Sequence, residues 1–296
     1  MAAEGLQLTY LADDQRRGAF AFAALFALES FARALCASVI TVQAHDLLND
    51  NQKVATLYLV VGIGGLLATL TIPYVIARSA RRWVYTAGAI GLMLASALLA
   101  THALSAQAAG MLVRIIGTAC LNITLSLYIM DHIRKKELVR SEPMRLALSA
   151  ASWTVGPYLG VYLYENFAIW VPFALSAVSA LALLALFWVL RLRETVIRPA
   201  RQRPANPLAY IERFVRQPRL RLAWAIAFGR SCFWSSFFIY GPLLMITSGV
   251  GKEAGGLLVS LGQVGLVTAW FFGRVAQKTG VRRVIAGSLG VLGLTC

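Results

Sequence analysis

Residues 54 to 82 read VATLYLVVGIGGLLATLTIPYVIARSARR, and this stretch decides the class of the protein. Its first 24 residues contain no charged side chain, whereas its last five contain three arginines. A helix needs about 20 predominantly apolar residues to cross the hydrocarbon core of a bilayer. A run of this length that stops at a cluster of arginines predicts a membrane-spanning helix that ends at a membrane surface.

Comparable apolar runs occur along the whole chain and predict nine spans. We expect them at roughly residues 18–42, 52–77, 83–103, 107–130, 145–164, 167–190, 220–247, 254–277 and 281–296. The ninth run has about 16 residues before the sequence stops, which is too few to cross a core of ~30 Å at 1.5 Å per residue. We therefore expect residues 1–296 to be a truncated sequence that does not transport on its own.

Positive charges alternate between the two sides of the predicted membrane. If the N-terminus is inside, the inner loops hold 23 Lys and Arg, and the outer loops hold two, Lys53 and Lys252. Short loops rich in Lys and Arg stay in the cytoplasm. We expect a multi-pass protein of a bacterial cytoplasmic membrane, with its N-terminus inside and membrane lipids around it.

The net charge of +15 arises from the Lys and Arg of these inner loops. A basic soluble protein would indicate nucleic acid as the partner, but here the excess lies beside helix ends, where it meets anionic headgroups. Nucleic acid is therefore not expected as a partner.

The sequence contains no common catalytic or cofactor motif. It has no HExxH, no nucleophile elbow and no phosphate loop, and its four cysteines are scattered through predicted spans. Scattered cysteines of this kind read as small apolar residues. We expect neither an enzyme, nor a bound cofactor, nor a metal site.

The longest polar stretch divides the chain. Residues 1–190 form a six-span half, 191–219 a basic cytoplasmic linker, and 220–296 the start of a second half. A short helix is expected between Asn206 and Pro218, because Asn-Pro is a helix-start signal and the segment has one apolar face. It lies in the membrane interface or is a solvated connector.

Two inner loops share a pattern at a distance of 200 residues. Residues 73–82 read PYVIARSARR, and residues 273–282 read GRVAQKTGVR. A loop pattern that recurs at matching places in two halves indicates a parallel internal repeat.

This organisation resembles the major facilitator superfamily of secondary transporters, whose loop after the second helix carries G-x-x-x-D-[RK]-x-G-[RK]-[RK]. Positions that match are Arg78, Arg81 and Arg82 in the first copy and Gly273, Lys278, Gly280 and Arg282 in the second. Both copies lack the acid, which is Ala77 or Gln277 here. The resemblance implies an all-α membrane protein, an MFS-type helical bundle with six transmembrane helices followed by about three of a second six-helix half.

The fifth span contains GPYLG, which includes Gly156, Pro157 and Gly160. It looks like the glycine and proline core of the fifth helix in efflux-type members of the superfamily, and its role there is gating. The alternative is a kinked, closely packed helix without that role.

Four ionisable residues fall inside predicted spans: Glu29, Arg33, Arg114 and Arg230. Charges at membrane depth are costly, so they are the first candidates for a transport site. Glu29 and Arg33 are four residues apart, a spacing that lets their side chains meet on one helix face. The functional hypothesis makes Glu29 the protonatable group and one arginine the binding or gating group. The alternative is a structural ion cluster.

Further residues are weaker candidates. Asn122, Trp153, Trp234 and Tyr240 line the cavity or serve in packing. Asp131 opposes the dipole of its helix end, and we expect it to pair with Arg78 or Arg81. The three histidines, His45, His102 and His132, lie at loop edges and are expected to be solvated.

These features together predict a secondary active transporter that exports a small molecule by alternating access, with protons as coupling ion. The excess of arginine at membrane depth leaves organic-anion uptake open. The missing motif acids leave open a non-transporting receptor or assembly factor on the same scaffold. The protein is expected to be a monomer.

Overall fold

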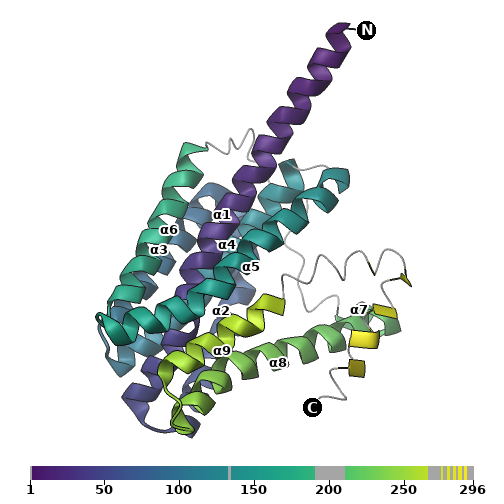
Figure 1. Ribbon diagram of the computed structural model, residues 1–296. Helices are drawn as coiled ribbons and strands as arrows, with labels where there is room; N and C mark the ends of the chain where they lie inside the picture. Colours follow the sequence, from purple (N-terminus) through teal and green to yellow (C-terminus); the bar gives the residue numbers. More distant parts are fainter. Residues whose placement is uncertain are drawn as a thin grey trace.

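The computed structural model describes residues 2–132, 135–190 and 211–265, with single residues and short pieces between 275 and 291. Within these residues, side chains are described from residue 23 onwards, except at 130–146, 211 and 213. The helices are α1 (Ala2–Leu48), α2 (Asn51–Arg78), α3 (Arg81–Ala100), α4 (Leu104–His132), α5 (Lys135–Asn166), α6 (Val171–Val189), α7 (Ile211–Val215), α8 (Pro218–Thr247) and α9 (Lys252–Val264). The described residues contain no strand, so the expected all-α class is confirmed (Figure 1).

Six of these helices are long and apolar enough to cross a membrane: α1 from Ala23, α2, α3, α4 up to Ile129, α6 and α8. Among the residues whose side chains are described, α5 does not meet this criterion, although the sequence predicts a span over residues 145–164. Serine and threonine at positions 149, 152 and 154 lower the hydropathy of its apolar stretch, and two of them contact α1: Ser149 bonds to Ser30, and Ser152 donates to the Ala27 carbonyl. The predicted ninth span is described only in short pieces, at residues 283–284, 286–288 and 290–291.

The first span continues further than its hydropathy indicates. Helix α1 ends at Leu48, six residues beyond the expected end at 42. The polar Gln43 stays inside the bundle because its side-chain amide donates a 2.8 Å hydrogen bond to the carbonyl of Leu99. As a result Asp46 lies on the last turns of α1. Asp50 then starts α2, accepting hydrogen bonds from the backbone N–H groups of Gln52 and Lys53.

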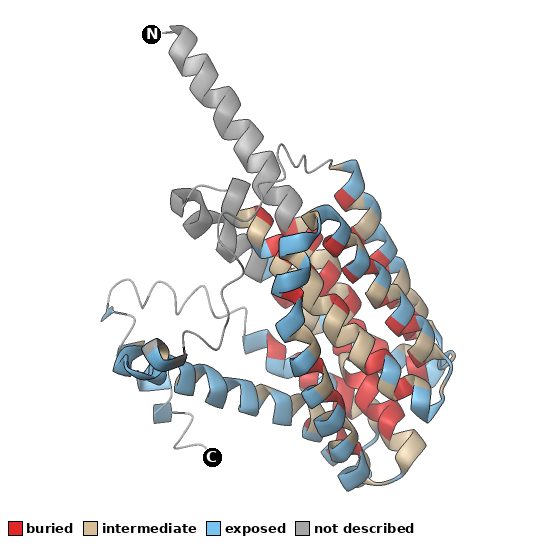
Figure 2. Cartoon of the chain, turned by 180° about the vertical axis from the view of Figure 1, so that it is seen from behind, coloured by how far each residue is buried: buried red, intermediate tan, exposed pale blue. Residues whose placement is uncertain are grey.

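Helix α1 lies at the centre of the first half. It packs against α5 and α6, while α3 packs against α4 and α6, and α2 covers α4. Buried positions gather along these shared faces (Figure 2). One core cluster is built around Tyr85 and Phe187, whose rings stack at 4.2 Å, and a second around Leu35, Val39 and Phe173.

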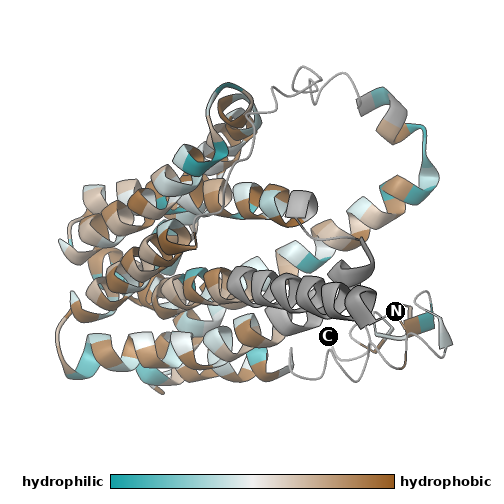
Figure 3. Ribbon diagram, turned by 90° about the horizontal axis from the view of Figure 1, so that it is seen from above, coloured by the Kyte–Doolittle hydropathy of each residue, from teal (hydrophilic) through white to brown (hydrophobic). Residues whose placement is uncertain are grey.

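The outer surface of the bundle suits a lipid environment. Large apolar side chains of α2 are exposed, among them Leu59, Val60, Ile63 and Leu66. Hydrophobic residues, coloured brown, occur along the helices throughout the bundle (Figure 3). Exposed apolar area of this extent is rare on soluble monomers and is the expected face toward acyl chains.

The GPYLG segment brings α5 against the backbone of α1. A Cβ on Gly156 would lie 2.5 Å from the Cβ of Ala34, and one on Gly160 would overlap the carbonyl oxygen of Leu35. Glycines four residues apart occupy the same helix face, so neither position has room for a side chain. Close packing is therefore one task of this segment.

Helices α8 and α9 fall in the part of the chain predicted to start a second half, and they contact α1 and α5 of the predicted first half near one end of the bundle. We call this end the outer end, after the orientation predicted from the charges. The three buried residues of α8, Gly241, Pro242 and Leu243, lie in its last third. Its beginning lies away from the first half, next to α7 (Figure 1).

Candidate functional site

Glu29 and Arg33 form an ion pair near the middle of α1. Arg33 Nη1 lies 3.2 Å from Glu29 Oε1. The Glu29 side chain is fully buried, whereas 27% of the Arg33 side chain is exposed. The carboxylate is therefore enclosed by the bundle, and the guanidinium reaches toward its edge.

Arg114 joins this pair from α4. Its Nη2 donates a hydrogen bond to the main-chain carbonyl oxygen of Arg33. Three of the four charges predicted at membrane depth thus come together from two helices that are far apart in sequence. Two guanidinium groups and one carboxylate give this group a formal charge of +1.

An aromatic series connects Arg33 to the second half. The guanidinium carbon of Arg33 lies 5.7 Å from the ring centroid of Trp153 on α5, within the range of a cation–π contact. Trp153 meets Phe238 of α8 edge-on at 5.5 Å, and Phe238 lies 5.7 Å from Trp234. Trp153 and Phe238 therefore lie where α5 meets α8, whereas Trp234 packs against Phe238 within α8.

The other predicted residues lie apart from this group. Arg230 and Tyr240 are exposed on α8, and Asn122 is half-buried on α4.

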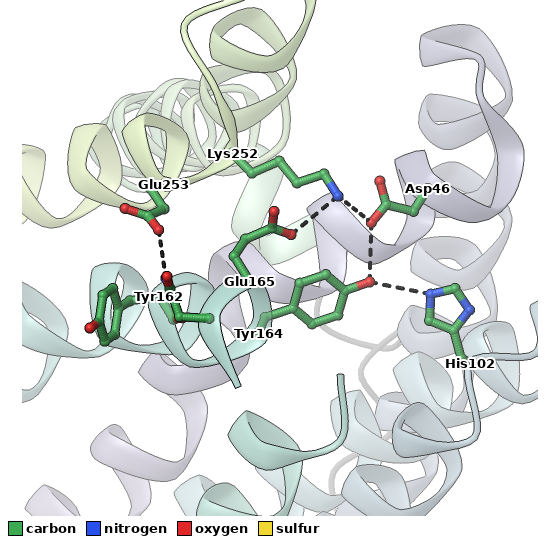
Figure 4. Close-up of polar contacts among 8 residues, drawn as sticks. Asp46, His102, Tyr162, Tyr164, Glu165, Lys252 and Glu253 are labelled. Carbon is green, nitrogen blue, oxygen red and sulfur yellow. Dashed lines mark hydrogen bonds and ion pairs between the residues drawn. The ribbon is translucent and has the colours of Figure 1, made fainter. Parts of the chain in front are cut away.

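A second polar cluster joins the two halves at the outer end (Figure 4). Lys252, at the start of α9, places its Nζ 2.8 Å from Asp46 Oδ2 and 3.2 Å from Glu165 Oε1. Nearby, Asn166 donates a 2.7 Å hydrogen bond to Glu253 Oε1. Both contacts tie α9 to helices of the first half.

Two further side chains extend this cluster within the first half. The Tyr164 hydroxyl donates to Asp46 Oδ2 over 3.1 Å, and His102 Nε2 lies 3.2 Å from the same hydroxyl. His102 was expected to be solvated, which is wrong: it is half-buried and bonded. Its φ of 53° is uncommon for a residue with a side chain.

The sequence profile of the Major Facilitator Superfamily matches residues 18–296. The chain belongs to the major facilitator superfamily. The predicted family is thereby confirmed, and the protein is an integral, multi-pass membrane protein whose family is one of secondary transporters of small molecules. No curated protein sequence matches the chain.

The loop positions of the superfamily pattern are only partly described. Arg78 is exposed at the end of α2, Arg81 begins α3, and Arg82 lies 5.8 Å from the ring of Trp83. The side chain of Asp131 lies outside the described residues, as do Gly273, Lys278 and Arg282, so the expected pairing of Asp131 stays a prediction. Gly280 has a φ of 91°, a conformation that favours glycine.

Electrostatics favour the charged form of Lys252. Burial by itself lowers the pKa of an ammonium group, but the hydrogen bonds and charges of Asp46 and Glu165 outweigh it and raise the pKa of Lys252. A raised pKa means that the ionic contact is fully present below the ordinary lysine value. The contact weakens only as the pH rises through the raised value.

One feature of the sequence indicates the outer cluster. Lys252 is one of only two cations in the predicted outer loops. Its partners Asp46 and Glu165 lie 206 and 87 residues away. Their pairing depends on tertiary structure, which no local spacing encodes.

Proposed function

We propose that this protein is a proton-coupled exporter of a small molecule that works by rocking its two halves around a midplane site. Glu29 is the proton-binding group, and Arg33 and Arg114 hold or gate the substrate. The observation that carries this proposal is the fully buried Glu29 carboxylate, paired with Arg33 and joined by Arg114.

Burial makes a purely structural role expensive for this group. Removing a carboxylate from water costs several kcal/mol even after relaxation, and intramembrane charges are retained mainly where ions or substrates pass. Arg33 is also the charged residue that touches the aromatic contact between the halves. A change in the Glu29–Arg33 pair can therefore be transmitted to α8.

The function is tested in proteoliposomes with the full-length protein. Thermal-shift screening of purified protein against metabolites and drugs identifies a ligand. Counterflow of that labelled ligand then separates a transporter from a receptor on the same scaffold. Export is supported when an inward proton gradient drives the ligand outward, and flux that ignores the gradient contradicts proton coupling.

Organic-anion uptake is the second candidate, favoured by the formal charge of +1 around Glu29, Arg33 and Arg114. A site with two guanidinium groups suits a carboxylate or phosphate ligand. The same reconstituted system distinguishes the two candidates by the direction in which an applied gradient moves the ligand.

The proposed orientation predicts a labelling pattern. Cysteines placed singly at Asn51, Ser105 and Gly251 in a cysteine-free protein react with an impermeant thiol reagent added outside intact cells. Those at Ser79, Glu137 and Gln202 react only after the membrane is opened. The reverse pattern at any two of these sites contradicts an N-terminus inside the cell.

A further inference from the structure

The outer cluster contains the ion pairs that bridge the two halves among the described residues, and its chemistry goes beyond the proposed central site. Asp46 of α1 and Glu165 of α5 both lie on the first half, whereas Lys252 starts α9 of the second half. One ammonium group thus serves two carboxylates across the boundary. Figure 4 shows Lys252 between them.

We propose that Lys252, Asp46 and Glu165 form an outer latch. The Lys252 ammonium, shared by the two carboxylates, holds the halves together at the outer end. His102 and Tyr164 act as positioning residues that fix Asp46 for this contact. Opening the latch is required for the protein to expose its interior to the outside.

The direction of the hydrogen bonds supports this assignment. The Tyr164 hydroxyl has a single proton, and it donates that proton to Asp46 Oδ2. His102 Nε2 lies 3.2 Å from the Tyr164 hydroxyl oxygen. Because the hydroxyl proton goes to Asp46, His102 Nε2 must be the donor in this contact. The Asp46 oxygen that receives Lys252 Nζ is therefore oriented by a series of donors that begins at His102.

The backbone of His102 is consistent with a specific placement. A φ of 53° lies in the left-handed region, which is uncommon for a residue with a side chain, and such conformations occur where the surrounding structure requires them. His102 lies in the connection between α3 and α4, so a change in that connection would reach Asp46 through Tyr164.

The residues one to two turns deeper than the latch show which position it keeps away from outside water. Thr41 lies five residues before Asp46 on α1, about 7.5 Å deeper at 1.5 Å per residue. Its side chain is fully buried, bonded to the Tyr58 hydroxyl at 2.7 Å and close to the Phe238 carbonyl of α8 at 3.5 Å. Separation of α8 and α9 from α1 would uncover this position to outside water.

The test measures how fast Thr41→Cys, in a cysteine-free full-length protein, reacts with an impermeant thiol reagent from outside. We expect Lys252→Gln to raise the reaction rate at least about fivefold, the lower end of ordinary coupling between protein sites. Glu165→Gln is a second, independent way to weaken the latch. The exchange of charges in Asp46→Lys with Lys252→Asp is expected to return the rate toward that of the parent.

The matched control is Lys53→Gln, which removes the other cation of the outer loops from an exposed position on α2. It leaves the rate unchanged if the latch depends on Lys252 itself and not on the total outer charge. An equal rate in the parent and in both Lys252→Gln and Glu165→Gln overturns the proposal. So does an equal rise with Lys53→Gln.

The positioning residues are tested by a double-mutant cycle. Tyr164→Phe raises the Thr41→Cys rate in the parent but has no further effect with Asp46→Asn, because it acts only through Asp46. His102→Ala is expected to raise the Thr41→Cys reaction rate. His102→Gln keeps an N–H donor and is expected to raise that rate less. Additive effects of Tyr164→Phe and Asp46→Asn contradict the positioning role. The readout needs neither substrate nor a proton gradient, so it stands even if proton coupling at Glu29 fails.

Discussion

Gly160→Ala lowers the thermal stability of the protein, because the added methyl group meets the backbone of α1. A Cβ at this position would overlap the carbonyl oxygen of Leu35. A backbone atom cannot move aside as a side chain can, so α1 and α5 must separate. Overpacking of a close contact typically costs about 1–3 kcal/mol and occasionally more. Larger residues at this position, such as leucine, are expected to prevent folding.

Thermal unfolding of the purified protein in detergent measures this loss. The matched control is Gly62→Ala on α2, where nothing lies within 4 Å of an added Cβ. Alanine also has a higher helix propensity than glycine by about 1 kcal/mol, so Gly62→Ala is neutral or stabilising. Equal unfolding temperatures for Gly160→Ala and the parent would show that the α1–α5 contact tolerates a methyl group.

The sequence predicts helices well where a single average property decides them. The run between residues 52 and 77 became α2 (Asn51–Arg78), because hydropathy over about 20 residues measures what a bilayer requires. The same average predicts the end of α1 six residues too early. Gln43 reads as a loop residue, but a hydrogen bond to Leu99 keeps it inside the bundle.

Part of the central site can be predicted from the sequence. Glu29 and Arg33 lie four residues apart, so one helix is enough to predict their contact. The sequence also predicts Arg114 at membrane depth, but its bond to the backbone of Arg33 depends on how α4 packs.

The outer cluster was not predicted, because its members come from four separate parts of the chain. His102, Tyr164, Asp46 and Lys252 are each ordinary polar residues near a predicted helix end. Only folding brings them together. Their placement follows from α1 continuing to Leu48 and from the close packing of α5 against α1.

Glu29→Gln abolishes transport driven by a pH gradient while substrate exchange continues. Glutamine has nearly the volume of glutamate, and its side-chain oxygen can still accept a hydrogen bond from Arg33, so the local packing remains. It cannot bind or release a proton at neutral pH. Exchange of labelled for unlabelled substrate needs no net proton movement, whereas gradient-driven flux does.

Arg114→Ala has a different expected effect, because this residue carries a fixed charge. Its removal leaves the carbonyl of Arg33 without this donor and reduces the formal charge around Glu29. Substrate binding weakens, or the protein stops in one conformation, and both gradient-driven flux and exchange fall together. A variant that loses gradient-driven flux alone would assign Arg114 to proton coupling instead.

The matched control for Glu29→Gln is Glu212→Gln on α7. Glu212 also pairs with an arginine four residues later, Arg216, but both side chains are mostly exposed. Exposed pairs contribute about 0–1 kcal/mol, so this change should leave both modes of transport intact. Because the two pairs share their chemistry and spacing, a difference between the variants isolates the effect of burial at membrane depth. If Glu29→Gln keeps full pH-driven flux, Glu29 is a structural partner of Arg33, and another acid couples transport to protons.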